Sequence, residues 1–391
     1  MRWLLLFLCL SLASLASLTL VRAPDFMLTW KLAILAGEFG HWLVFLPIGL
    51  AVVTGFATRG NWRIGLLLIC GLAAACLLRP FVSARGVAAR LPADLRAAFG
   101  PNTGAGPGLD FVRLYHRAAA PAARVRTEVF ARPDGQELKV DFYDPAYAKD
   151  VLGKPRPCVV VIHGGGWDGG DRGQLADWNH RLVARGYVVA AISYRLAPRW
   201  IWPAQRDDVL AAIGWLKANA ERLELDPHRL VLLGRSAGAQ LATAVGYGVD
   251  DRAIRGVIAL YGPHDMPFAW SVSREDDALN SIKLFRQYFG GPPDTQARRA
   301  LYEGASGQLQ ARAGSPPTLL IHGVSDTLSW YRHSERLAAR LQELGVPHYF
   351  LKLPWATHGF DFNADGPGGQ LADAAIGGFL QSVVGRPADD R

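Results

Sequence analysis

The sequence predicts an α/β fold, in which a mostly parallel central sheet carries helices on both faces, preceded by N-terminal transmembrane helices. Two observations lead to this prediction. From about residue 125 onward, short apolar runs typical of strands alternate with longer segments typical of helices, and this alternation indicates a parallel sheet. Before residue 80, three long apolar runs have the character of membrane spans instead.

The first apolar run covers residues 3–21 and lies between Arg2 and Arg22. A basic start and an apolar middle fit a signal peptide, and the run is also long enough to span a bilayer. Because Arg22 makes a poor cleavage site before Ala23, the sequence favours an uncleaved helix.

The second and third runs are less uniform. Residues 28–56 carry Lys31, Glu38 and His41 in their first half, so we expect an amphipathic lead-in and a span over residues 40–56. Residues 62–78 are short for a span and are followed by Arg79 and Pro80. Residues 1–80 are thus predicted to be an anchor of two to three transmembrane helices. The protein is then a multi-pass protein, of the inner or plasma membrane if its source is bacterial.

The chain of 391 residues has a formal charge of +8, all of it in the N-terminal third. Residues 1–124 hold 12 basic and 4 acidic side chains, whereas residues 125–391 hold 30 of each. Because the excess flanks apolar runs, the expected partner is a lipid bilayer and not a nucleic acid. Arginines on both sides of the third run leave the side of the membrane open, and the sequence carries no signal for oligomeric state.

The four cysteines show neither an evident pairing nor the spacing of a metal site. They lie in apolar runs or in an expected core strand: Cys9, Cys70, Cys76 and Cys158. We therefore expect inert thiols.

Residues 81–124 are predicted to be a linker, because they are rich in alanine and arginine and contain a Gly/Pro-rich stretch at 100–108, with a short helix at 110–120. The α/β domain is expected over residues 125–391. Its strands are expected at 126–131, 138–143, 158–163, 188–193, 230–234, 256–261, 318–322 and 349–353, the first two forming a hairpin. Its helices are expected at 174–185, 204–219, 237–246, 331–344 and 371–383. Residues 263–315 are polar, aromatic and irregular, and fit an insertion over a substrate pocket.

The stretch 234–238, Gly-Arg-Ser-Ala-Gly, follows the apolar run 230–233 and precedes a run of small residues. It is predicted to turn a strand sharply into a helix, which the two glycines permit. Ser236 at the tip is the candidate nucleophile, on an elbow whose next N–H group, from Ala237, faces the reacting carbonyl oxygen. Upstream, residues 163–167 are His-Gly-Gly-Gly-Trp after another apolar run. Consecutive glycines there suit an oxyanion hole.

A serine hydroxyl needs a base, and the base needs a third group that orients it. In a fold of this kind the chain order is serine, acid, histidine. Asp326 follows the strand expected at 318–322, and His358 follows the strand expected at 349–353, so they are the candidate acid and base.

Other residues of the same types compete for these roles. Asp361 and Asp265 are alternative acids that are less well placed along the chain. His163 and His322 end strands, and we expect them to brace loops by hydrogen bonds.

Together these motifs resemble the hormone-sensitive-lipase-like, or acetyl-esterase, group of α/β-hydrolases over residues 125–385. Further matching stretches are Tyr-Arg-Leu-Ala-Pro at 194–198, Trp-Pro-Ala-Gln at 202–205 with Asp207 and Asp208, and His-Gly-Phe at 358–360. The N-terminal helices and the sequence Ser-Ala-Gly-Ala at 236–239 also resemble the membrane-bound isoprenylcysteine methylesterases.

The resemblance implies the α/β-hydrolase fold and a set of site residues. It places the nucleophile, acid and base on Ser236, Asp326 and His358, and the oxyanion donors on the backbone of Gly165, Gly166 and Ala237. Two residues depart from the family pattern: Arg235 stands where many relatives have an acidic residue or glutamine, and Ala239 replaces a glycine. Both departures leave the substrate open. Trp167 and Arg235 are candidate substrate contacts.

The function expected from these residues is a membrane-anchored serine carboxylester hydrolase that works through an acyl-enzyme, without a metal or organic cofactor. One alternative keeps the chemistry but cleaves an amide or formamide. A second is a non-catalytic ligand-binding module, as in the gibberellin receptors that resemble this group. Those receptors depart at the base, whereas all three residues are present here, which argues for an enzyme.

The expected substrate is a small-molecule ester with a short-to-medium acyl group, or a small lipophilic ester. Aromatic residues of the insertion and of the motif loops are candidates for the pocket lining, although about half of them are expected to pack in the core. They are Phe268, Trp270, Phe285, Tyr288 and Phe289 in the insertion, and Trp167, Trp200 and Trp202 near the motifs.

Overall fold

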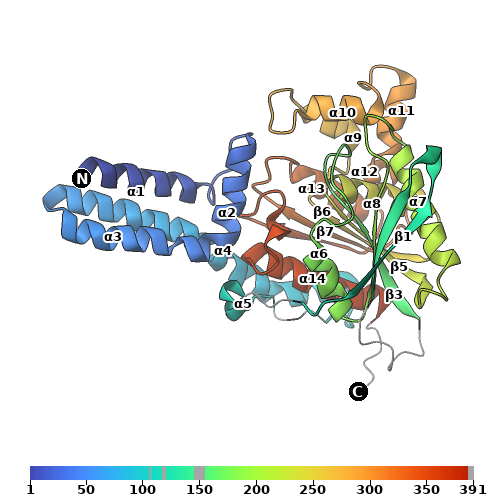
Figure 1. Cartoon of the computed structure of the whole chain (residues 1–391), viewed down its shortest axis with the longest axis horizontal. Helices are drawn as coiled ribbons and strands as arrows, with labels where there is room; N and C mark the ends of the chain where they lie inside the picture. Colours follow the sequence, from blue (N-terminus) through green and yellow to red (C-terminus); the bar gives the residue numbers. More distant parts are fainter. Residues whose placement is uncertain (105, 107, 117–119, 145–154, 386–391) are drawn as a thin grey trace.

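The computed structural model describes residues 1–104, 106, 108–116, 120–144 and 155–385. A bundle of N-terminal helices projects from a larger α/β domain (Figure 1). The Gly/Pro-rich stretch at 100–108 and the helix expected at 110–120 lie partly outside the described residues; within them, α5 (Phe111–Tyr115) forms.

The α/β domain is built on one eight-stranded sheet whose order is β1-β2-β4-β3-β5-β6-β7-β8. Strands β1 and β2 form the predicted hairpin, β2 pairs antiparallel with β4, and all remaining pairs are parallel. The strand predictions are confirmed to within a few residues. Their bounds are β1 (Arg124–Ala131), β2 (Leu138–Asp144), β3 (Arg156–Ile162), β4 (Val188–Ile192), β5 (Leu225–Arg235), β6 (Ile254–Leu260), β7 (Thr318–Gly323) and β8 (His348–Leu353).

Helices cover both faces of this sheet, so its central strands are apolar on both sides. Within β3, Val160 packs into one core while Val159 and Val161 pack into the other. The first core contains α7 (Ala204–Ala218), α8 (Ala237–Gly248) and α13 (Arg332–Glu343). The second contains α6 (Ala176–Ala184) and α14 (Pro367–Val384). All five are the helices that the sequence predicted.

The insertion at 263–315 is helical, which corrects the prediction that it is irregular. It contains α9 (Met266–Val272), α10 (Ser281–Phe289), α11 (Gln296–Gly304) and α12 (Gly307–Gln310). Each of the first three begins at a side-chain cap that satisfies a free backbone N–H group. The caps are Asp265, Asn280 and Thr295.

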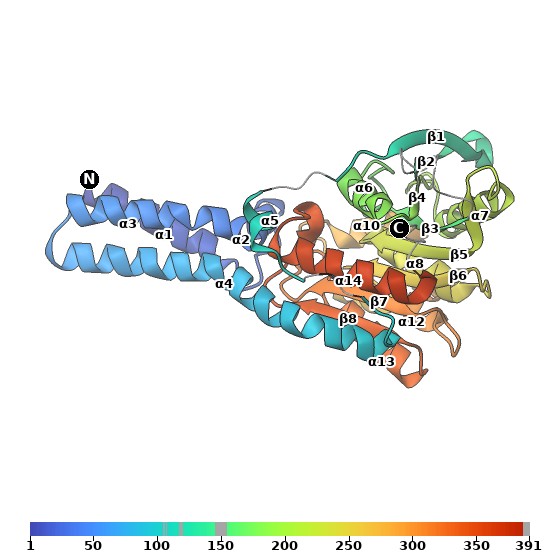
Figure 2. The same ribbon diagram turned by 90° about the horizontal axis from the view of Figure 1, so that it is seen from below.

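The N-terminal region forms α1 (Arg2–Ser17), α2 (Met27–Leu43), α3 (Phe45–Ala57) and α4 (Gly60–Phe99). Helices α1, α3 and the first half of α4 lie side by side and point away from the sheet, whereas α2 lies at the junction with the α/β domain (Figures 1 and 2). The thiols of Cys9 and Cys70 meet inside this bundle, 3.6 Å apart, a contact that the sequence spacing did not indicate.

Among the described residues, α4 is the one helix that is long and apolar enough to cross a membrane. Helices α2 and α3 are long and apolar enough to cross a membrane only when they are taken together, and they meet at an angle of 59°. The span predicted over residues 40–56 is therefore wrong at its start. Pro47 in the first turn of α3 lacks the N–H group that would continue the hydrogen bonding of α2, so the chain bends there.

Residues 81–99 are not the predicted linker, because α4 continues through Pro80 and Pro92 to Phe99. A proline inside a helix removes one hydrogen bond and favours a kink, and α4 changes direction as it leaves the bundle (Figure 2). The helix persists because its apolar residues recur at helical spacing and are buried in the second core: Ala84, Val87, Leu91 and Leu95. The second half of α4 is thus part of the α/β domain.

Candidate active site

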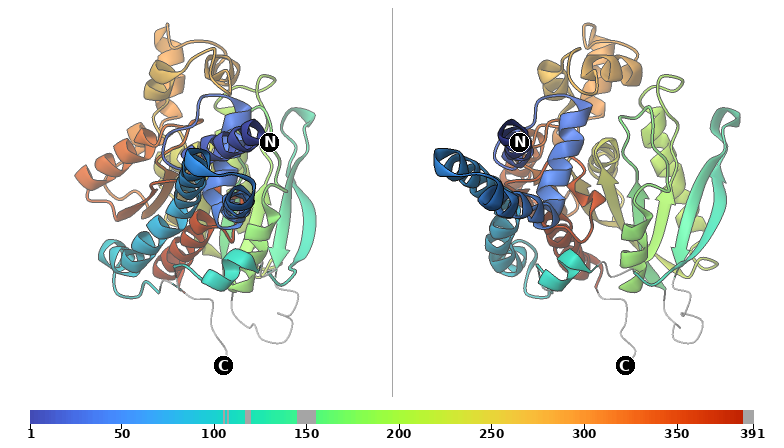
Figure 3. Two further views of the ribbon diagram at one scale, coloured as in Figure 1. Left: turned by 90° about the vertical axis from the view of Figure 1, so that its left-hand side faces the viewer. Right: turned by 60° about the vertical axis from the view of Figure 1, so that its left-hand side comes forward.

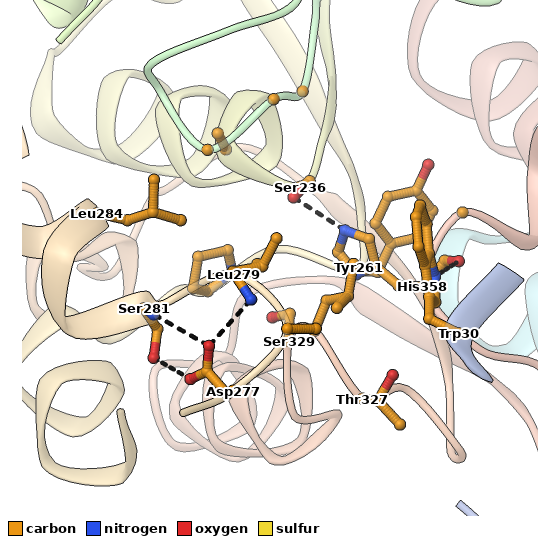
Figure 4. Close-up of a pocket in the computed structure, with 18 of the residues that line it drawn as sticks. Trp30, Ser236, Tyr261, Asp277, Leu279, Ser281, Leu284, Thr327, Ser329 and His358 are labelled. Atoms are coloured by element: carbon orange, nitrogen blue, oxygen red, sulfur yellow. Dashed lines mark hydrogen bonds between the residues drawn. The ribbon is translucent and has the colours of Figure 1, made fainter. Parts of the chain in front are cut away.

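Three side chains from separate loops meet at the carboxyl edge of the parallel strands. Ser236 lies between β5 and α8, Asp326 follows β7, and His358 follows β8. The Ser236 Oγ atom lies 2.9 Å from His358 Nε2 (Figure 4). On the other side of the ring, His358 Nδ1 lies 2.7 Å from Asp326 Oδ2. The structure therefore brings the three predicted residues into one hydrogen-bonded line.

The partners of His358 fix which of its nitrogens carries the proton. A carboxylate only accepts hydrogen bonds, so Nδ1 donates to Asp326. In the neutral ring Nε2 is then an acceptor, and the Ser236 hydroxyl donates to it. This is the tautomer in which a histidine can take a proton from serine.

Asp326 is fully buried, yet it is held as a carboxylate. Burial by itself raises the pKa of this carboxyl, but His358 and the hydrogen bond from His322 outweigh it and bring the pKa well below its usual value. The other oxygen, Oδ1, accepts the backbone N–H groups of Leu328 and Ser329, both at 2.8 Å. The hydrogen bonds to both oxygens of Asp326 thus favour its carboxylate form, and the carboxylate orients His358.

His322 braces this loop, as predicted for a histidine at a strand end. Its Nε2 donates toward Asp326 Oδ2 at 3.1 Å and the Ser329 carbonyl at 2.9 Å, and its Nδ1 lies 2.8 Å from Ser334 Oγ. His163 plays a similar part at the end of β3, where its ring stacks on Tyr194 at 4.2 Å. Within the described part of the chain, neither histidine is hydrogen-bonded to Ser236.

The turn that presents Ser236 is strained, as the elbow motif predicts. Ser236 has φ 53° and ψ −119°, a conformation that non-glycine residues rarely adopt. The glycines on either side allow close backbone packing: a Cβ atom at Gly234 would overlap the carbonyl oxygen of Gly238, and one at Gly238 would overlap that of Ile162. The strain is held in place because the turn lies between the buried β5 and α8.

The predicted oxyanion loop lies beside this elbow. Gly164, Gly165 and Gly166 line the same cavity as Ser236 and Ala237. Gly165 has φ +121° and its Cβ position is occupied by the backbone of Gly169, so only glycine fits. Ala237 begins α8, and the positive end of a helix dipole points to this position.

Both competing acids have other partners. Asp265 pairs with Arg336 at 2.7 Å and caps α9. Asp361 accepts from Arg235 Nε at 2.5 Å and from the Tyr261 hydroxyl at 2.6 Å. Burial and the neighbouring Asp361 raise the pKa of Tyr261 well above its usual value, so its hydroxyl remains a donor.

Arg235 is therefore a structural partner of the loop that carries His358. Its guanidinium lies over the ring of Trp178, 5.6 Å from the ring centroid, and its side chain is 3% exposed. It also lines the cavity, and its Nη2 atom has no hydrogen-bond partner within the described chain. One edge of Arg235 thus stabilises Asp361, whereas Nη2 is buried without a hydrogen-bond partner among the described residues.

We expect Arg235→Met to lower the free energy of unfolding by about 3–5 kcal/mol, because it leaves the Asp361 carboxylate buried without a counter-charge. Thermal unfolding in detergent measures this loss. The matched control is Arg222→Met, which removes a similar pair with Glu128 at the surface and should cost at most about 1 kcal/mol. Equal losses for the two variants would contradict the structural role of Arg235.

The cavity above Ser236 has a volume of about 900 Å³. Of the rings expected to line it, Trp167 and Phe285 do so. Most of the others pack against neighbouring rings instead. Tyr288 stacks on Trp167 at 4.4 Å, and Phe289 stacks on Tyr302 at 3.8 Å. The insertion adds aliphatic residues to the wall, including Val272 and, as Figure 4 shows, Leu279 and Leu284.

Sequence motifs missed a second group of lining residues, which come from the N-terminal region. Trp30 and Ile34 of α2 reach the cavity beside His358 (Figure 4). The only signal was the mixed character of residues 28–41, where Lys31, Glu38 and His41 interrupt the apolar run. That pattern indicated a helix with apolar and polar surroundings, but it did not show that part of the helix lines this cavity.

Comparison with known proteins now identifies the family. The family model BD-FAE matches residues 140–341, which is more than half of the chain. The chain belongs to the BD-FAE family. This membership and esterase relatives such as those below place it in the α/β-hydrolase esterase group, as the motifs predicted.

Relatives of this BD-FAE protein include esterases from several sources. It is 29% identical to "Esterase LipC" of Mycobacterium tuberculosis over 60% of each chain. It is 39% identical to "Ethyl acetate hydrolase" of Pseudomonas putida over 58% of this chain and 72% of the relative. The match thus spans about three fifths of the length of LipC, and residues outside it have no counterpart in that comparison.

Solved structures show the fold of the BD-FAE protein. A thermophilic esterase of the Planctomycetes species Thermogutta terrifontis superposes with a TM-score of 0.56 at 24% identity, over 70% of this chain and 96% of that one. The shared part is the α/β-hydrolase fold with its mostly parallel sheet.

Proposed function

We propose that the protein is a membrane-anchored serine carboxylester hydrolase that acts through an acyl-enzyme. The observation that carries this proposal is the line from Ser236 through His358 to Asp326, with separations of 2.9 and 2.7 Å, at the floor of a large cavity. Family membership among esterases supports the choice of bond.

In the proposed mechanism Ser236 Oγ attacks the ester carbonyl carbon while His358 Nε2 takes the hydroxyl proton. The negative charge on the carbonyl oxygen is stabilised by backbone N–H groups of Gly165, Gly166 and Ala237. When the tetrahedral intermediate collapses, the bond to the alcohol oxygen breaks and His358 donates its proton to that oxygen. Water then attacks the acyl carbon while His358 Nε2 takes its proton. The bond between the acyl carbon and Ser236 Oγ breaks, His358 returns the proton to Oγ, and the acid leaves.

Membrane anchoring is proposed from the outer surface of the helical bundle. Phe56 is 90% exposed, and large apolar residues continue along α1, α3 and α4 with more than half of each side chain exposed: Trp3, Phe7, Phe45 and Leu68. A surface of this extent is unfavourable in water and stable in lipid. We propose that residues 1–80 anchor the chain and that residues 125–391 form the catalytic domain. Helix α2 and the second half of α4 pack against that domain.

A single labelling experiment tests both halves of this proposal. We expect a fluorophosphonate probe to label the wild-type protein in membranes that have been washed with carbonate, and not to label Ser236→Ala. Comparison of intact and lysed vesicles reports the side on which the catalytic domain lies. Release of the labelled protein by carbonate would contradict the anchor, whereas retained protein that no probe labels would contradict the serine hydrolase.

The acyl part of the substrate is proposed to be short to medium in length. We expect kcat/KM for p-nitrophenyl esters to rise about fourfold for each methylene that fits the pocket and then to fall. A series from acetyl to palmitoyl in detergent measures this. A rate still rising at palmitoyl would instead indicate a lipase, and cleavage of an aryl formamide without any ester turnover would indicate the amidase alternative.

A further inference from the structure

The N-terminal region builds one wall of the cavity that contains the catalytic serine and histidine. Its contribution comes from the turn after α1 and from α2, through Arg22, Asp25, Met27, Trp30 and Ile34. The Trp30 indole donates its N–H group to the backbone carbonyl oxygen of His358 at 2.9 Å. Trp30 and Ile34 also reach the next residue, since a Cβ atom at Gly359 would lie 3.7 Å from Trp30 and 3.8 Å from Ile34.

Helix α2 is fixed to the catalytic domain by buried polar contacts. The Glu38 carboxyl group accepts hydrogen bonds from Trp355 Nε1 at 3.1 Å and from the Gly368 backbone at 2.8 Å. The Asn363 side chain donates to the Glu38 carbonyl oxygen at 2.9 Å. These contacts hold Trp30 and Ile34 at a defined distance from His358.

The proton transfer from His358 determines which part of an ester contacts this wall. His358 must deliver its proton to the alcohol oxygen, so the alcohol leaves on the side of His358. Trp30 is on that side (Figure 4). Ile34 is there too, since it lies 3.8 Å from the Cβ position of Gly359, the residue after His358. On the other side, Leu284 of the insertion lies against the glycine loop, 3.3 Å from the Cβ position of Gly166.

The mouth of the cavity carries exposed apolar residues beside the exposed, ion-paired side chains of Arg22 and Arg274. Four of the residues that line it have large exposed fractions: Met27 42%, Val272 42%, Trp330 36% and Phe362 69%. Phe26 and Leu28, beside Met27, are exposed as well. Helix α2 lies where the helical bundle meets the α/β domain (Figures 1 and 3). The apolar residues at its start are therefore near the base of the surface proposed to contact lipid.

We infer that Trp30 and Ile34 bind the alcohol part of the substrate, and that this part is lipophilic and enters from the bilayer surface. The inference rests on the proposed function and deepens it, since it assigns the two parts of the ester to two walls. The N-terminal wall selects the alcohol, and the insertion selects the acyl group.

Two substrate series on the full-length protein in detergent test this assignment. The alcohol series is ethyl, butyl and hexyl acetate, and the acyl series is the p-nitrophenyl esters of acetate, butyrate and hexanoate. We expect Ile34→Ala to reduce the preference for hexyl over ethyl acetate by about tenfold, through KM, and to leave the acyl preference within twofold of wild type. Leu284→Ala should show the reverse.

Two tryptophan variants separate substrate contact from a structural effect. Trp30→Phe keeps the ring but loses the hydrogen bond to His358, so kcat should fall for all esters alike while the alcohol preference remains. The control is Trp42→Phe on the same helix, where the indole donates to the Leu114 carbonyl at 3.2 Å outside the cavity, and neither series should change. Fluorophosphonate labelling of each variant confirms that its active site is intact.

The assignment is overturned if Ile34→Ala lowers the rates of ethyl and hexyl acetate in the same proportion while the protein is still labelled. The bilayer route has its own test in phosphatidylcholine vesicles, where the rate with hexyl acetate should follow the mole fraction of ester in the lipid. A rate that follows only the aqueous concentration overturns that route. Failure of the wild-type protein to react with the probe or with any ester is a different result, and it would refute the proposed function itself.

Discussion

Ser236→Ala is expected to abolish the acyl-enzyme and to lower ester turnover by several powers of ten, to the level that the oxyanion loop and binding alone provide. The alanine removes only the Oγ atom that lies 2.9 Å from His358 Nε2. It leaves the glycine loop and the cavity in place. The measurement is kcat for a p-nitrophenyl ester together with a burst of p-nitrophenol, which reports the acyl-enzyme in the wild-type protein.

Folding of the variant is checked by its thermal transition. Because Ser236 has a positive φ, alanine keeps the strain at the elbow and should change stability little relative to serine. A folded Ser236→Ala protein with unreduced turnover would show that another residue is the nucleophile.

Asp326→Asn is expected to lower kcat by about 10⁴-fold with little change in fold. The amide can present its NH₂ group to His358 Nδ1, which then accepts, so that Nε2 carries the proton and can no longer take one from Ser236. The backbone donors of Leu328 and Ser329 still find the amide oxygen, which preserves the loop. Steady-state kinetics with the same ester measure the loss.

The matched control for this substitution is Asp265→Asn. Asp265 is also a buried carboxylate that accepts backbone and arginine hydrogen bonds, but its partners are Phe268 and Arg336. Its substitution should leave kcat within a few fold of wild type. If Asp265→Asn were inactive and Asp326→Asn near normal, the acid would be misassigned.

The candidate site could be predicted because its signals are local. In a parallel sheet the carboxyl ends of the strands share one edge, so loops that follow β5, β7 and β8 must meet there. Knowing that Ser236, Asp326 and His358 each follow a strand was therefore enough to bring them together. The rejection of Asp361 required the structure, because its pairing with Arg235 joins loops 126 residues apart in the chain.

Two of the differences between prediction and structure come from long-range packing. Pro80 and the arginines after it suggested that a span ends there, whereas burial against the sheet carries α4 on to Phe99. Hydropathy also cannot distinguish an apolar residue that faces lipid from one that faces a substrate. Trp30 and Phe56 belong to the same apolar region, yet one lines the cavity and the other is exposed at the end of the bundle.

The unbroken course of α4 has a geometric consequence for the whole molecule. At a rise of 1.5 Å per residue, its 40 residues measure about 60 Å, and they run from the tip of the bundle to the far side of the sheet. With the anchoring proposed above, the height and the rotational setting of the α/β domain above the lipid are set by a residue count. Adding one residue to α4 near Pro80 would turn the cavity mouth by about 100° about the helix axis and raise it by 1.5 Å.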